Sequence, residues 1–129
     1  MAHAKQTLPD AEPDVWAQAL AGVQEAADQF EPFRVAYNQA EGAWFAARSD
    51  GSADTEAQRK SAKARLDEAT EQERLFGNAL FDAASAVYRL PAPDLEGVIT
   101  KIEMTQTIGY DGSVEQLVLQ DLRRLARSG

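Results

Sequence analysis

The sequence contains no cysteine, and its only histidine is His3. Without cysteine the chain has no disulfide, no thiolate nucleophile and no cysteine-ligated metal. With a single histidine close to the first residue, a catalytic triad, an imidazole base and a histidine metal site all lack their usual side chain. We therefore expect a protein that is not an enzyme and that has no catalytic, metal-binding or cofactor-binding residues.

Long apolar runs are also missing. No stretch approaches the roughly 20 apolar residues that a membrane-spanning helix needs. Residues 1–14 carry one lysine and no apolar run, unlike a secretory signal peptide. We expect a cytoplasmic protein that makes no membrane contact.

Basic residues are scarce relative to acidic ones, with 13 lysines and arginines against 21 aspartates and glutamates and a formal net charge of −8. Such a surface repels phosphate backbones, so direct nucleic-acid binding is not expected. Hydrophobic residues make up 44% of the 129 residues. A chain of this length and composition suits one domain with a hydrophobic core.

Apolar residues at alternating spacings of three and four predict two long helices, over about 13–48 and 54–89. The first stripe includes Trp16, Leu20, Val23, Ala27, Phe30, Tyr37 and Trp44; the second includes Ala62, Leu66, Ala69, Phe76, Leu80, Ala83 and Val87. This repeat predicts a coiled-coil seam with a left-handed supercoil. Pro32 lies inside the first stripe, so we expect either one bent helix or two collinear pieces.

A turn at residues 49–54, which contains Gly51, folds these helices into an antiparallel hairpin. Two shorter helices are predicted over about 93–107 and 113–127, because Pro91 and Pro93 end the preceding helix. We expect Leu95, Val98, Ile99 and Ile102 to form the face of the third helix that covers the hairpin. The fold class is therefore all-α, with a mobile tail over residues 1–12 and a single helical domain over 13–129.

The geometry of the turn indicates which residues face each other across the hairpin. With the turn centred near Gly51, facing residue numbers sum to about 103, which places Ala27 opposite Phe76. The same geometry brings Arg34 near Glu73 and Glu41 near Arg65. We expect these two pairs to form ion pairs across the helices and to set their register.

Some apolar residues lie off the predicted core faces. They are Val35 and Phe45 in the first helix, Met104 and Ile108 in the third and Leu119 in the fourth. A cluster of such residues on a protein surface is typical of an interface. We expect a homodimer, because two hairpins side by side would make a four-helix bundle.

The segment Pro91-Ala92-Pro93-Asp94-Leu95, followed by an amphipathic helix, resembles small uncharacterised helical proteins of bacteria, often found near prophage genes. The resemblance covers about the last 40 residues. It implies a bacterial accessory protein and assigns no activity or site residue.

Two function classes remain open from the sequence. The first is a non-enzymatic helical protein that interacts with a protein partner or assembles with itself, and it rests on the long seam. The second is a small acidic inhibitor that occupies the nucleic-acid-binding site of a partner protein, and it rests on the charge of −8.

Overall fold

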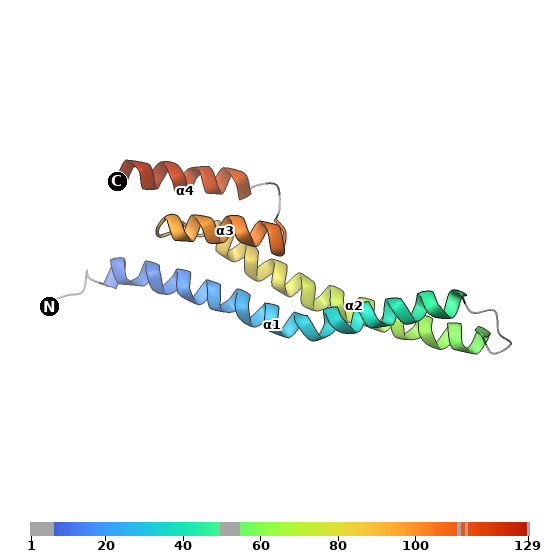
Figure 1. The fold of residues 1–129 in the computed structure, drawn as a ribbon. Helices are drawn as coiled ribbons and strands as arrows, with labels where there is room; N and C mark the ends of the chain where they lie inside the picture. Colours follow the sequence, from blue (N-terminus) through green and yellow to red (C-terminus); the bar gives the residue numbers. More distant parts are fainter. Residues whose placement is uncertain (1–6, 50–54, 111, 113, 129) are drawn as a thin grey trace. The chain divides into compact units, whose positions relative to one another are not determined.

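The computed structural model describes residues 7–49, 55–110, 112 and 114–128, which form four helices (Figure 1). They are α1 (Thr7–Ser49), α2 (Thr55–Arg89), α3 (Leu95–Thr107) and α4 (Val114–Ser128). The two long helices pack together and two shorter ones follow. The predicted all-α fold, with a hairpin and two C-terminal helices, is confirmed.

Most predicted helix ends lie within two residues of the observed ones, but the first helix starts six residues earlier. Residues 7–12, assigned to a tail from the sequence, belong to α1. α1 also runs through Pro32 as one helix rather than two pieces. His3, the turn at 50–54 and Ser113 lie outside the described residues.

The contacts divide the chain into two compact units. The terminal unit comprises Met1–Glu25 and Leu80–Gly129, and the hairpin unit comprises Ala26–Ala79. Each long helix thus contributes one part to each unit. The single domain predicted over 13–129 stays a prediction.

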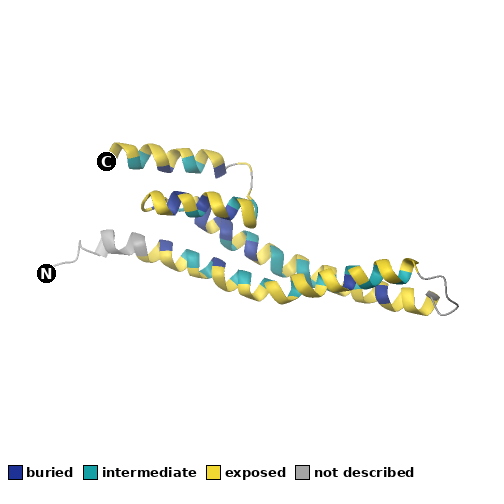
Figure 2. Cartoon of the chain, in the orientation of Figure 1, coloured by how far each residue is buried: buried dark blue, intermediate teal, exposed yellow. Residues whose placement is uncertain are grey.

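The hairpin unit is a two-helix layer held by aromatic rings against small residues. Phe33 of α1 stacks on Phe76 of α2, with ring centroids 4.1 Å apart. The nearby ring of Phe30 lies so close to Gly77 that a Cβ there would sit 3.3 Å from it. Within the described part of this unit the buried apolar residues are both alanines, Ala40 and Ala62 (Figure 2).

The register of the hairpin differs from the prediction. Phe76 stacks on Phe33, whereas the turn geometry placed it opposite Ala27. The ammonium group of Lys63 lies over the ring of Trp44, 5.9 Å from its centroid, which fits the same displacement. The prediction was wrong because it assumed a symmetrical turn, while contacts between large rings decide how two helices slide along each other.

The terminal unit has the larger core. Its buried apolar residues come from all four helices and the α2–α3 connection: Trp16, Val23, Leu80, Ala84, Val87, Tyr88, Ala92, Val98, Met104 and Val114. The buried Tyr88 hydroxyl donates a 2.6 Å hydrogen bond to the carbonyl of Gly109. Gly109 follows α3 with a φ of +113°, a conformation that glycine adopts without the penalty of a side chain. This bond ties the end of α3 to α2.

A substitution at Gly97 would test how closely α3 packs in this core. A Cβ at Gly97 would lie 2.9 Å from Pro93 Cδ and 3.2 Å from Trp16 Cζ2, while one at Gly22 would have no neighbour within 4 Å. We expect Gly97→Ala to lower the free energy of unfolding by about 1–3 kcal/mol. Gly22→Ala, the matched control, should raise it by up to about 1 kcal/mol because it adds helix propensity. Urea unfolding measures both, and equal effects would contradict the close packing.

Candidate functional site

The connection from α2 to α3 is a short non-helical segment, residues 90–94, whose polar groups are bound by side chains from the later helices. Asp94 caps α3, because its carboxylate accepts a 2.9 Å hydrogen bond from the amide of Gly97. The amide of Ala92 donates to Asp121 Oδ1 at 3.1 Å. Arg124 donates to the carbonyl of Ala92. The connection is therefore held by α4, which begins 20 residues further on.

A buried ion pair lies at the centre of this arrangement. Lys101 Nζ is 2.6 Å from Asp121 Oδ2, and the two side chains are 1% and 5% exposed. The same ammonium group donates a 2.6 Å hydrogen bond to the carbonyl of Leu90, past the last residue of α2. It also lies 5.8 Å from the centroid of the Trp16 ring. A charge this deeply buried needs such partners, because desolvation costs several kcal/mol per ion.

This ion pair decides which side of α3 faces inward. Gly97, Lys101 and Met104 lie on one side of the helix and are buried. Leu95, Ile99 and Ile102 lie on the opposite side, given 3.6 residues per turn, and Ile99 is 48% exposed. Of the four residues expected to cover the hairpin, Val98 is buried, as predicted, whereas Leu95, Ile99 and Ile102 point outward.

Met104 was predicted as an interface residue, and the structure contradicts this. Met104 is 7% exposed, and Ile108 is half-buried. The prediction assigned the Met104 side of α3 to solvent because Lys101 lies between Gly97 and Met104 and marks that side as solvent-facing in the sequence. Its partner Asp121 comes from another helix, so the sequence pattern of α3 alone does not reveal the burial.

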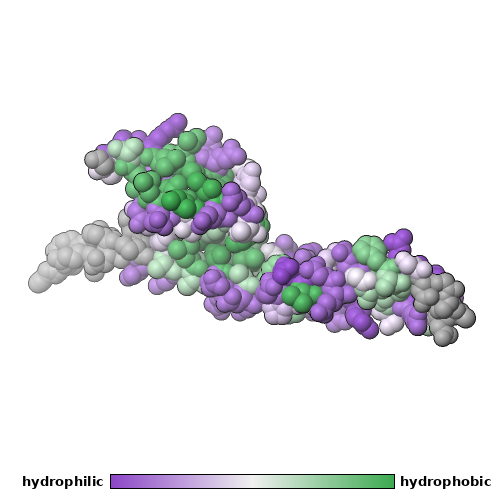
Figure 3. Space-filling view, in the orientation of Figure 1, coloured by the Kyte–Doolittle hydropathy of each residue, from purple (hydrophilic) through white to green (hydrophobic). Residues whose placement is uncertain are grey.

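The exposed apolar residues of α3, α4 and their turn form one surface, which we call the outer face. Its members are Leu95, Ile99, Ile102, Tyr110, Leu119 and Leu122. Figure 3 shows apolar residues gathered over α3 and α4. Between these helices lies a hollow of about 300 Å³, lined by residues that include Ile102, Tyr110 and Val118. The outer face is thus continuous from one helix to the other.

Charged residues lie at both edges of the outer face. Glu96 and Glu103 are exposed on the edge of α3 that lies away from α4. Arg123 is exposed on the edge of α4 that lies away from α3. These edges follow from helix periodicity, because Ile102 and Thr105 of α3 and Val118 of α4 line the hollow between the helices. The surface is therefore mainly apolar, with Glu115 at the hollow between the helices, acidic residues along one edge and Arg123 along the other.

The remaining interface candidates are exposed. Leu119 belongs to the outer face, and Val35 and Phe45 lie on α1 in the hairpin unit, with Phe45 53% exposed. Val35 and Phe45 are ten residues apart, about 80° on the helix circumference, so they do not share one stripe. The surface that the structure brings together is the outer face, and Leu119 is the predicted residue that it contains.

The expected cross-helix ion pairs do not form among the described residues. Arg34 pairs instead with Glu31, 2.6 Å away on the same helix, with both side chains exposed. The hydrogen bond from Arg34 lowers the pKa of the Glu31 carboxyl. Glu41 accepts a 3.0 Å hydrogen bond from the Tyr37 hydroxyl, which raises the pKa of Tyr37. Partners within a helix prevail because an i,i+3 or i,i+4 neighbour is always within reach.

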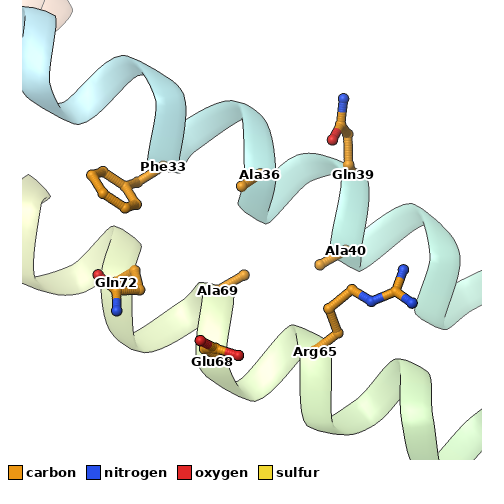
Figure 4. Close-up of a pocket in the computed structure, with 8 residues that line it drawn as sticks. All are labelled: Phe33, Ala36, Gln39, Ala40, Arg65, Glu68, Ala69 and Gln72. Atoms are coloured by element: carbon orange, nitrogen blue, oxygen red, sulfur yellow. The ribbon is translucent and has the colours of Figure 1, made fainter.

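Arg65, the predicted partner of Glu41, lies in a groove of about 620 Å³ between α1 and α2. Figure 4 shows its side chain extending from α2 towards α1. Ala36, Ala40 and Ala69 form the bottom of the groove, and Phe33 lies at one end. Alanines offer little apolar area, so this groove is a weaker docking surface than the outer face.

The sequence does contain a signal for the buried pair. Lys101 follows Gly97 by four residues and precedes Met104 by three, while Asp121 falls between Val114, Leu117 and Leu125 in the core repeat of its helix. Two residues of opposite charge at core positions of consecutive helices indicate a buried pair. Tyr88 offers no comparable signal, because an apolar stripe accepts a tyrosine without showing where its hydroxyl binds.

No helix among the described residues is long and apolar enough to cross a membrane. Across the same residues, no group of three or more histidine, cysteine, aspartate or glutamate side chains could hold a metal ion. Searches with family models, among curated proteins and among solved structures found no match to this chain.

Removing one member of the buried pair should be strongly destabilising. We expect Asp121→Ala to lower the free energy of unfolding by about 3–5 kcal/mol, because Lys101 would stay buried without its counter-charge. Lys101→Met combined with Asp121→Leu should recover much of this loss, since no buried charge then remains. Arg74→Ala, which breaks the exposed pair with Glu71, is the control and should leave the unfolding midpoint nearly unchanged. Additive effects of the two core substitutions would contradict the pairing.

Proposed function

We propose that this protein is a non-enzymatic helical assembly module that self-associates through the outer face of α3 and α4. The observation that carries the proposal is the side of α3 that faces outward. Leu95, Ile99 and Ile102 are 61%, 48% and 44% exposed although they form a regular apolar stripe. Single exposed apolar residues are common, but a stripe continued by Leu119 and Leu122 is typical of a surface that binds protein.

The pattern of charge favours a second copy as the partner. In a two-fold dimer with its axis parallel to the helices, α3 of one copy lies over α4 of the other. The acidic edge with Glu96 and Glu103 then meets the basic edge with Arg123. The apolar side chains of the two outer faces then meet in a bundle of four helices, an arrangement that buries them in both copies.

The size of the outer face sets the expected strength of the dimer. A helix of 13 residues, the length of α3, is about 20 Å long, and two adjacent helices cover about 20 Å in width. The face is therefore on the order of 400 Å² per copy, below the roughly 800 Å² of a standard interface. We expect a reversible dimer with a Kd on the order of 10–100 µM.

The direct test is the mass of the protein in solution as its concentration rises. Light scattering should show the wild type moving from the 14.1 kDa of one chain towards twice that value. The Ile99→Glu variant should remain monomeric, because burying a carboxylate in the interface is strongly unfavourable. Ala86→Glu, which adds the same charge at an exposed position of α2, is the matched control and should behave as the wild type.

A charge exchange separates this dimer from other modes of self-association. Arg123→Glu should weaken the dimer, and Glu103→Arg in the same chain should restore it, because the two edges face each other only in the proposed arrangement. A wild type that remains a monomer at the highest concentration would overturn the proposal. Dimerisation that Ile99→Glu leaves intact would overturn the choice of surface.

A further inference from the structure

A second feature of the terminal unit lies at the junction of α2, α3 and α4. A pocket of about 370 Å³ opens there, and its lining includes Arg89, Lys101, Gln120, Arg124 and Arg127. Its volume is at the lower end of the range for small-molecule sites. Its polar lining sets it apart from the outer face and from the alanine groove of the hairpin unit.

Positive charge is concentrated at this pocket in an otherwise acidic chain. Residues 80–129 contain five basic residues, and the four that line the pocket are all but Arg123. One acidic residue, Asp121, lies among them, and its carboxylate is bound by Lys101 at 2.6 Å and by the amide of Ala92 at 3.1 Å. The basic side chains of the lining therefore outnumber its one carboxylate.

Arg124 and Arg127 lie at the edge of the pocket, and hydrogen bonds hold Arg124 in place. Arg124 is fixed by its bonds from Nη2 to the carbonyl of Ala92 and to Asp121. A guanidinium group carries five N–H donors, so an arginine anchored in this way retains donors for another acceptor. Arg127 lies three residues further along α4, close to one helical turn away, and has no carboxylate partner among the described residues.

We propose that this pocket binds the phosphate group of a small molecule. Arginine binds phosphate and carboxylate oxygens in pairs of hydrogen bonds. The guanidinium groups of Arg124 and Arg127, about one turn apart on α4, suit a tetrahedral dianion with several acceptor oxygens better than a planar carboxylate with two. The site is separate from the outer face and does not depend on the proposed dimer.

The test is a titration with inorganic phosphate, monitored by the amide chemical shifts of the protein. It is carried out at constant ionic strength and at a protein concentration at which the chain is monomeric. We expect saturable shifts in residues 88–92 and 117–127, with a Kd on the order of 1 mM. Arg127→Gln should weaken binding about tenfold, as expected for the loss of a charge-assisted hydrogen bond. Arg123→Gln removes the same charge four residues away, outside the pocket, and should change the Kd by less than about twofold because salt screens distant charges.

A further variant and titrations with other anions identify the chemical class of the ligand. Gln120→Glu, which places a carboxylate in the lining, should abolish binding without altering a core residue. Acetate should bind more weakly than phosphate. Tighter binding of glycerol phosphate than of inorganic phosphate would assign the site to a phosphate ester, and the reverse order would assign it to the free ion. Equal weakening by Arg127→Gln and Arg123→Gln, no saturable shift, or binding of long polyanions alone would overturn the proposal.

Discussion

The buried ion pair between Lys101 and Asp121 is the constraint on which the terminal unit depends. Its 2.6 Å contact joins α3 to α4, and the same lysine binds the carbonyl of Leu90 after α2. Three helices and their connection are thus joined by two side chains. A buried pair adds little net stability, but its loss leaves an uncompensated charge. We interpret the pair as a device that selects one packing of α3, because the inverted packing would bury the apolar stripe and expose the lysine.

This selection explains why apolar residues face outward in an acidic protein. α3 has two sides with apolar character, and hydrophobic burial alone would favour the side with Leu95, Ile99 and Ile102. The ion pair and the close contacts around Gly97 hold the other side inward. The outer face is left uncovered by the packing of the unit itself, and the proposed dimer buries it without disturbing the pair. The buried ion pair thus both selects the packing of α3 and leaves the outer face exposed.

The hairpin unit follows a different principle. Its helices meet through stacked rings and alanines, and its polar side chains find partners along their own helix, as Arg34 does with Glu31. A layer of two helices shields one side of each, so most of its aromatic residues are half-buried and Phe45 is exposed. The terminal unit, with segments from four helices, buries Tyr88 and Val87 almost completely. Charged side chains therefore join different helices in the terminal unit, whereas in the hairpin unit they pair with neighbours on their own helix.

The sequence by itself determined the helices and most of their ends, because apolar periodicity, prolines at 91 and 93 and the cap at Asp94 act over a few residues. It also identified exposed Leu119, since an apolar residue off a helix stripe is visible locally. The register of the hairpin, the inward side of α3 and the burial of Met104 were decided by tertiary structure. Each depends on a partner far away in the chain: Phe33 on Phe76, and Lys101 on Asp121. Periodicity shows that a side is apolar, but only a contact with a distant residue selects which of two sides is buried.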